Sequence, residues 1–275
     1  MIGLSRWARG ALATNAWMVY VFFYAPIAVL VVYSFNDNTL VGVWTEASLR
    51  WYREMLENEA VLRALRNSLV VAVISTIVAT ALGTMAALAL ERYRWRGRRA
   101  FDALQYLPII IPDVTMAVMM LLFFVQVFQL AGFADLRLSL GIGTISISHI
   151  AFNISFVAVV VRARVSGLDP QLEEAAADLY ANRWATFRRV TLPLIAPGIA
   201  GGALLALTLS LDDVVITSFV SGPGSTTLPV YVFGLVRRGV TPLINAVSTV
   251  MLVASILLVL ASLAFQRRGE EGKAT

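Results

Sequence analysis

Three aspartates lie inside long apolar stretches of the sequence, where an unpaired carboxylate is costly and therefore usually has a function. Asp113 follows two prolines, and Asp212 and Asp213 are neighbours in a later stretch. Carboxylates in such surroundings attract cations, so these side chains are candidates for contacts with a positively charged solute. A structural role is the alternative, because a carboxylate in lipid also pairs with an arginine or caps a broken helix.

The chain lacks the residues that most enzymatic sites require. It has one histidine, His149, and no cysteine, which excludes a zinc cluster, a disulfide framework and a cysteine nucleophile. Its one lysine, Lys273, is not part of a GxxxxGK[ST] phosphate-binding loop. We therefore expect a non-catalytic protein that binds no metal or cofactor, and any ATP-driven work needs a partner.

The composition is typical of a membrane protein: of 275 residues, 59% are apolar and 14% charged, and the mean hydropathy is +0.77. A helix crosses the hydrocarbon core in about 20 residues. Six apolar stretches are long enough: residues 16–35, 68–90, 104–131, 140–161, 194–220 and 243–265. Because lipid cannot satisfy backbone polar groups, we predict an all-α bundle of six transmembrane helices, a single domain over 1–275 with its core at about 66–266.

The basic residues indicate the orientation of this bundle. Fifteen of the 22 lie near the two ends of the chain and in the connections at 91–100 and 162–191. The positive-inside rule places both termini and these two connections in the cytoplasm. The span at 16–35 lacks a cleavage site and is predicted to remain as an anchor. Short arginine clusters between apolar stretches argue against nucleic acid as a partner, and the cluster at 92–99 is expected to contact membrane lipid.

The inner connection at 162–193 has the signals of ordered structure. Asp169-Pro170 is typical of a helix start, and Glu173 and Glu174 follow in the first turns, where carboxylates complement the helix dipole. Asn182 is predicted to cap a second short helix, which is expected to end at Leu192-Pro193. A helix, a turn and a helix in a connecting loop suggest a docking surface for another protein.

The sequence of this connection resembles the EAA loop of bacterial permeases of ATP-binding-cassette (ABC) importers. In that pattern, EAA is followed after three residues by Gly, and after nine more residues by Ile, any residue and Leu-Pro. Here EAA stands at 174–176 and VTLP at 190–193, so the spacing is the same. Tyr180 occupies the glycine position. If the backbone there is left-handed, tyrosine costs about 1 kcal/mol or moves the turn to Ala181-Asn182. The resemblance implies coupling to an ATPase through Glu173, Glu174, Ala175, Ala176, Asp178, Tyr180, Leu192 and Pro193.

Three further segments resemble the spermidine/putrescine permeases: PDV at 112–114, HIAFN at 149–153 and SLDDVVITSFVSGP at 210–223. The resemblance implies the second permease subunit of a type I, MetI-like importer in the bacterial cytoplasmic (inner) membrane. It also implies three kinds of partner: a homologous permease, an ATPase dimer that binds the ATP and Mg, and an extracytoplasmic solute-binding protein.

A polyamine carries ammonium groups on a methylene chain, so we expect spaced carboxylates and aromatic faces, each face contributing about 0.5–2 kcal/mol. The candidates for this pathway are Asp113, Asp212, Asp213, Phe152 and Phe219, with Phe156 and Trp44 as further aromatic candidates. Asp113 is expected near the midplane of a span that Pro108 and Pro112 loosen. Adjacent positions of a helix point about 100° apart, so Asp212 and Asp213 are not expected to face one pathway equally.

Other interpretations remain open at this point. His149 and Asn153 share a face of the fourth span and either bond to a neighbouring helix or contact the solute. The cargo of the same fold is alternatively another small organic solute, a metal or an oxyanion. A stand-alone channel or proton-coupled carrier is the remaining alternative, although it would not need a docking loop.

Overall fold

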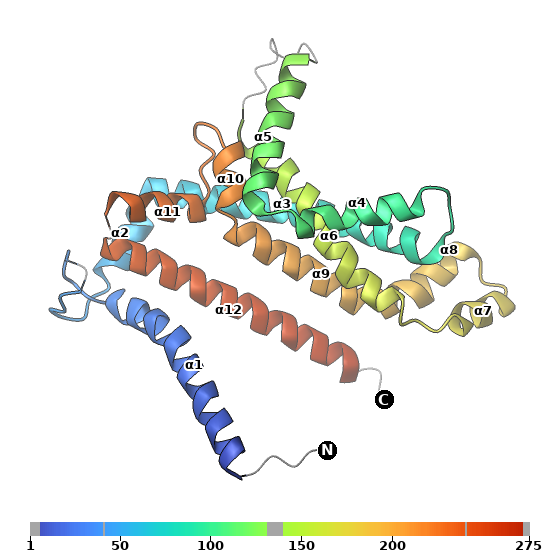
Figure 1. Cartoon of the computed structure of the whole chain (residues 1–275), viewed down its shortest axis with the longest axis horizontal. Helices are drawn as coiled ribbons and strands as arrows, with labels where there is room; N and C mark the ends of the chain where they lie inside the picture. The colour runs from blue at the N-terminus through green and yellow to red at the C-terminus, as the bar shows by residue number, and fades with distance from the viewer. Residues whose placement is uncertain (1–5, 41, 131–139, 240, 272–275) are drawn as a thin grey trace. The chain divides into compact units, whose positions relative to one another are not determined.

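The computed structural model describes residues 6–40, 42–130, 140–239 and 241–271; Ala131, at the end of the third predicted span, and Lys273 lie outside this part. Within it, regular structure is helical apart from one antiparallel bridge, Asn36 with Ala47, as the all-α prediction expects. The helices (Figure 1) are α1 Arg6–Tyr33, α2 Arg50–Glu57, α3 Glu59–Arg92, α4 Arg98–Ile110, α5 Asp113–Leu130, α6 Ile142–Val165, α7 Gln171–Asp178, α8 Arg183–Thr186, η2 Phe187–Thr191, α9 Leu192–Asp212, α10 Val215–Val220, α11 Leu228–Arg238 and α12 Pro242–Glu271.

The chain divides into two compact units, residues 1–62 with 234–254 and residues 63–233 with 255–275. In the first unit, α1 is an apolar helix whose most hydrophobic window has no buried residue, as expected for a helix that faces lipid. After it, the buried side chain of Asn36 organises the loop before α2. Its amide donates to the Val43 carbonyl at 2.7 Å, and Trp51 Nε1 donates to the Asn36 carbonyl at 2.7 Å.

The second unit is built around α6, which packs closely against α3 and α9. Gly198 and Gly202 of α9 form a GxxxG pattern on the face toward α6, where a Cβ on Gly202 would lie 3.2 Å from Val157 Cγ1. On α3, a Cβ on Gly83 would lie 2.8 Å from Val157 Cβ. These glycines let the backbones approach, which is how helices associate where the hydrophobic effect is absent.

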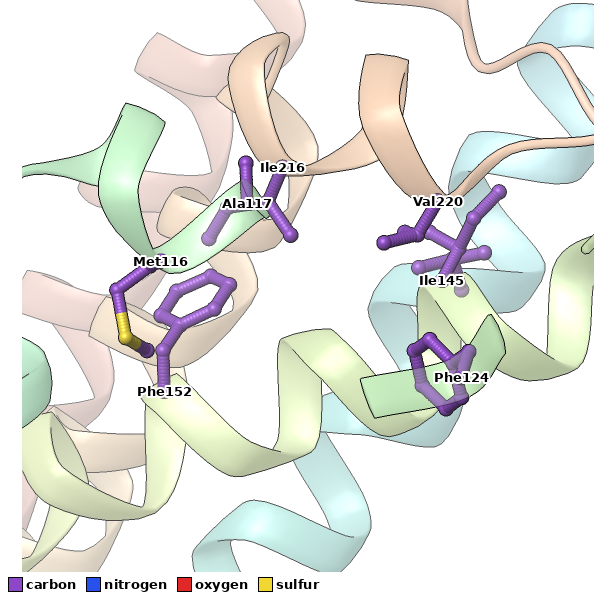
Figure 2. Close-up of a cluster of buried hydrophobic side chains, with 8 residues drawn as sticks. Met116, Ala117, Phe124, Ile145, Phe152, Ile216 and Val220 are labelled. Atoms are coloured by element: carbon purple, nitrogen blue, oxygen red, sulfur yellow. The ribbon is translucent and has the colours of Figure 1, made fainter. Parts of the chain in front are cut away.

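Two clusters of buried apolar side chains fill this unit. The first joins α3, α5, α6 and α10 (Figure 2) and consists of Val71, Met116, Ala117, Phe124, Ile145, Phe152, Ile216 and Val220. The second joins α3, α6 and α9 and consists of Ala86, Ala87, Val157, Ala158, Val161, Val165, Ile195 and Ala206.

Among the described residues, four helices are long and apolar enough to cross a membrane, and the bent pair of α4 and α5 adds a fifth crossing if it counts as one span. The four are α1, α3, α6 and the continuous helix Arg183–Asp212. The sixth predicted span, residues 243–265, lies within the 30-residue helix α12. The orientation of the termini and the single-domain assignment stay predictions.

The third predicted span, residues 104–131, is wrong as a single helix. The axes of α4 and α5 differ by 113° across the break at Ile111 and Pro112. Proline lacks the amide hydrogen that continues a helix and pushes the preceding residue toward extended backbone, and Ile111 is extended at φ −73° and ψ 132°. The expected loosening is therefore a complete break, and Asp113 begins α5.

The fifth predicted span, residues 194–220, is wrong at both ends. The short helix that begins after Asn182 does not stop at Leu192-Pro193, because a π-helical segment at Phe187–Thr191 carries it into α9. The π segment changes the hydrogen-bond register: the Leu192 amide donates to the Phe187 carbonyl. Pro193 consequently lies in the first turn of α9, where a missing amide donor is tolerated. At the other end α9 stops at Asp212.

Candidate functional site

A pocket of about 240 Å³ lies where the two broken helices meet in the second unit. Residues on both sides of each break and residues of α6 line it. They are Pro108, Asp113, Met116, Phe152, Phe156, Leu209, Asp212, Asp213, Val214, Val215 and Ile216. Met116, Phe152 and Ile216 also belong to the first core cluster, where the Phe152 ring lies next to Met116 (Figure 2), so one wall of the pocket is firmly packed.

Asp113 and Asp212 are both exposed at this pocket. Neither carboxylate has an ion-pair or hydrogen-bond partner among the residues that the structure describes. No basic side chain appears in the described lining of the pocket. Pairing with an arginine is therefore not seen for these two aspartates among the described residues, while Asp113 lies in the first turn of α5, where a carboxylate complements the helix dipole.

Asp213 has a different environment from its neighbour. Its Oδ2 accepts the backbone amide of Thr217 at 2.7 Å and the Thr217 hydroxyl at 2.7 Å, and its Oδ1 accepts the Ile216 amide at 3.2 Å. His149 Nε2 lies 3.3 Å from the same Oδ2. Asp213 thus caps α10, as the structural alternative expects of it.

Asp212 and Asp213 both line this pocket, but they do not face it equally. Asp212 is exposed, whereas Asp213 is partly buried and bonds to Ile216 and Thr217. The helix ends at Asp212, because the backbone at Asp213 has φ −68° and ψ 125°, and this ψ turns the chain out of α9.

The predicted helix in the connection at 162–193 is α7, whose start is capped by Asp169 Oδ1, which accepts the Gln171 amide at 2.9 Å. At its end the Ala181 amide donates to the Ala176 carbonyl at 3.0 Å and the Tyr180 amide to the Ala177 carbonyl at 2.9 Å. This pair of bonds is the Schellman motif, which needs a left-handed residue.

Tyr180 is that left-handed residue, with φ +59°. The turn has therefore not moved to Ala181-Asn182. Instead, Asn182 caps the next helix, its Oδ1 accepting the Ala185 amide at 2.8 Å.

The two neighbouring glutamates of this loop have separate environments. Glu173 is partly buried: it pairs with Arg92 at the end of α3 and accepts the Thr191 hydroxyl at 2.5 Å. Burial would raise the pKa of the Glu173 carboxyl, but the bonds from Thr191 and Arg92 outweigh it and hold the pKa below its ordinary value. Glu174 is exposed.

An exposed apolar surface continues from Glu174 around the turn. Leu179, Tyr180 and Trp184 are 82%, 98% and 67% exposed, which is unusual for large apolar side chains unless they meet a partner. Leu192, in contrast, packs against the second core cluster. The loop thus has an outer surface, formed by Glu174, Leu179, Tyr180 and Trp184, and an inner attachment, formed by Glu173 and Leu192.

Comparison with known proteins agrees with this architecture. Residues 79–271 match the family described as the binding-protein-dependent transport system inner membrane component. The chain belongs to this family. The chain is 46% identical to the putrescine transport system permease protein PotI of Escherichia coli K12, over 86% of this chain and 83% of that one. It is 37% identical to the spermidine/putrescine transport system permease protein PotC of the same strain, over 99% and 98%.

Solved structures show the same fold. A bacterial ABC transporter that imports the acidic polysaccharide alginate aligns with a TM-score of 0.77 at 21% identity, covering 95% of this chain and 96% of that chain. The MetNI methionine ABC transporter aligns at 0.59 and 17%, covering 76% and 93%. The family match and the relatives PotI and PotC confirm the resemblance to ABC-importer permeases: the chain is a multi-pass inner-membrane transport subunit, and a stand-alone channel or carrier has no support.

The structure of this permease brings together most of the predicted pathway residues. Asp113, Asp212, Asp213 and Phe152 line one pocket, whereas Phe219 is 38% exposed and is not among the lining residues. Trp44 belongs to the first unit. Sequence reasoning missed a clamp at the ends of three helices: Arg162 of α6, counted above only for orientation, donates at 2.5 Å both to Glu91 of α3 and to Asp102 of α4. Opposite charges in neighbouring loops were the available signal.

Proposed function

We propose that this permease subunit passes polyamines such as putrescine and spermidine across the membrane. The observation that carries the proposal is the pocket at the two helix breaks, where Asp113 and Asp212 have no partner among the described residues and Asp213 is adjacent. Ammonium groups on a methylene chain suit separated carboxylates, and Phe152 and Phe156 offer aromatic faces that each attract a cation by about 0.5–2 kcal/mol. The names of PotI and PotC, relatives over most of the chain, support this cargo.

The size and charge of the pocket favour a slender cation. Its volume of about 240 Å³ lies below the range of about 300–1,000 Å³ that drug-sized ligands occupy. Three carboxylates at one pocket repel an anion and attract an ammonium group. The fold shared with an alginate importer therefore does not extend to its acidic cargo.

The exposed surface of the EAA loop is the proposed docking site for a partner ATPase dimer, which binds the ATP and Mg; this chain binds no cofactor. Glu174 supplies a charge there, and Tyr180 and Trp184 supply apolar contact area. A homologous permease completes the membrane part. A solute-binding protein delivers the polyamine from outside, to the loops at 36–67 and 221–242.

The inner attachment of the loop transmits the motion of the ATPase. Glu173 joins α7 to α3 through Arg92 and to the π segment through Thr191, which continues into α9. A push on α7 is therefore passed to the helix that ends at Asp212 in the pocket. Alternating access follows if ATP-driven closure of the partner shifts these helices between two arrangements.

Transport by a reconstituted complex tests the proposal. This chain, its partner permease, the ATPase and the binding protein are placed in liposomes, and ATP-dependent uptake of labelled putrescine and spermidine is measured. We expect uptake of both, and hydrolysis that increases with the loaded binding protein. Assembly and hydrolysis without uptake of either polyamine would contradict the proposed cargo.

A further inference from the structure

A chain of buried polar side chains leads from α3 to the pocket. Ser75 Oγ lies 3.0 Å from Ser210 Oγ, and Ser210 Oγ lies 2.6 Å from His149 Nδ1. On the other side of the ring, His149 Nε2 lies 3.0 Å from Thr217 Oγ1 and 3.3 Å from Asp213 Oδ2. Ser75, His149 and Thr217 are completely buried and Ser210 is 5% exposed. The chain connects α3, α9, α6 and α10.

The donors and acceptors of this chain place a hydrogen on one ring nitrogen of the histidine. The Thr217 hydroxyl gives its hydrogen to Asp213 at 2.7 Å, and the carboxylate has none to give. His149 Nε2 therefore faces two acceptors and carries a hydrogen, while Nδ1 shares a hydrogen bond with the Ser210 hydroxyl. Every member then has a partner, which a polar group at this depth requires.

We infer that His149 is the positioning residue for the carboxylate of Asp213, and through it for the break between α9 and α10. Oδ2 of Asp213 accepts hydrogen bonds from His149 and from the amide and hydroxyl of Thr217, whereas Oδ1 accepts, among the described residues, only the Ile216 amide and keeps acceptor capacity. The imidazole fixes the side of the carboxylate that faces the protein. The inference rests on the proposed polyamine function.

Two substitutions at His149 separate its two hydrogen bonds. The amide of glutamine reaches the position of Nε2, and that of asparagine stands near the position of Nδ1. His149→Gln should keep polyamine uptake within about twofold of the wild type, while His149→Asn should lower it about fivefold, the scale of one lost hydrogen bond. The complexes are compared in liposomes at equal amounts. Equal loss in both variants would overturn the inference in favour of simple packing.

A double-substitution cycle shows whether His149 acts through Asp213. In an Asp213→Asn background, His149→Asn should reduce uptake by less than about twofold, because the carboxylate that it positions is gone. A full additional loss in that background would also overturn the inference. Should His149→Asn fail to assemble, Thr217→Val removes the hydroxyl between the two groups and should show the same dependence on Asp213.

The same pair of substitutions can be compared by the unfolding temperature of the complex, a measurement that does not depend on the cargo. If the wild-type complex imports no polyamine, the proposed function fails, but coupling between the His149 and Asp213 substitutions in the unfolding temperature still supports the contact. Additive shifts in unfolding temperature would refute it.

Discussion

The left-handed tyrosine at the end of α7 gives a prediction whose sign the structure determines. A residue with a Cβ in this conformation costs about 1–2 kcal/mol, which glycine does not incur. The Tyr180 ring is 98% exposed, so its removal loses almost no packing. Glycine costs roughly 0.5–1 kcal/mol more than other residues to order on folding. Tyr180→Gly should therefore stabilise the turn, by about 0.5–1 kcal/mol.

Hydrogen exchange at the Ala181 amide measures this change locally. That amide closes the turn onto the Ala176 carbonyl at 3.0 Å. A gain of about 0.5–1 kcal/mol slows exchange, corrected for the intrinsic rate, by about two- to fivefold. Tyr180→Ala is the matched control, because it removes the ring but keeps the Cβ and its cost.

Two results would refute this reasoning. Faster exchange in Tyr180→Gly would mean that the backbone there is right-handed, where glycine destabilises a helix. Equal slowing in the glycine and alanine variants would mean that loss of the ring, and not relief of backbone strain, is the cause.

Three further predictions concern the attachment of the loop and the packing of the helices. Glu173→Gln should loosen α7 from α3, which faster hydrogen exchange in α7 would show. Glu174→Gln should leave exchange in α7 unchanged and weaken retention of the ATPase in pull-downs. The reverse pattern would contradict the assignment of Glu173 to attachment and of Glu174 to docking. Because the pKa of Glu173 is lowered in the folded state, the carboxylate stabilises the attachment of α7 at neutral pH, and this stabilisation should be lost as the pH falls through the lowered pKa. Hydrogen exchange in the Glu173→Gln variant should lack this acid dependence. Gly83→Ala should lower the stability of the complex by about 1–3 kcal/mol, since the added Cβ would meet the Ile154 carbonyl at 2.9 Å. Gly201→Ala is the control and should be near neutral, because its added Cβ would have its nearest contact at 3.7 Å. Thermal unfolding of the complex measures both.

The helices of this permease could be located from sequence because apolar length and capping residues are local signals. Asp169 and Asn182 cap helices where their types predict them. Tyr180 was recognised as a departure from the family pattern, and the structure shows that the turn keeps its shape and accepts the strain. Such features depend on a few consecutive residues.

The break at Asp213 and the long-range pairs could not be predicted in the same way. Hydropathy is the same for a straight and a broken helix, and no proline or glycine marks the extended backbone at Asp213. The partner of Glu173 is Arg92, far away in sequence, so only the tertiary fold reveals that this glutamate faces inward. His149 likewise meets Asp213 only because α6 packs beside the α9–α10 break.

Uptake by carboxylate variants tests the central claim, that the aspartates at the helix breaks carry a cationic solute. Labelled putrescine and spermidine uptake is measured with equal amounts of intact complex containing Asp113→Asn, Asp212→Asn or Asp213→Asn. An ammonium group that loses a compensating charge loses about 1.4 kcal/mol or more, so the first two should each reduce uptake about tenfold or more while sparing assembly. Asp213→Asn should reduce it less and lower the stability of the complex. Wild-type uptake in both the Asp113 and Asp212 variants would contradict the account.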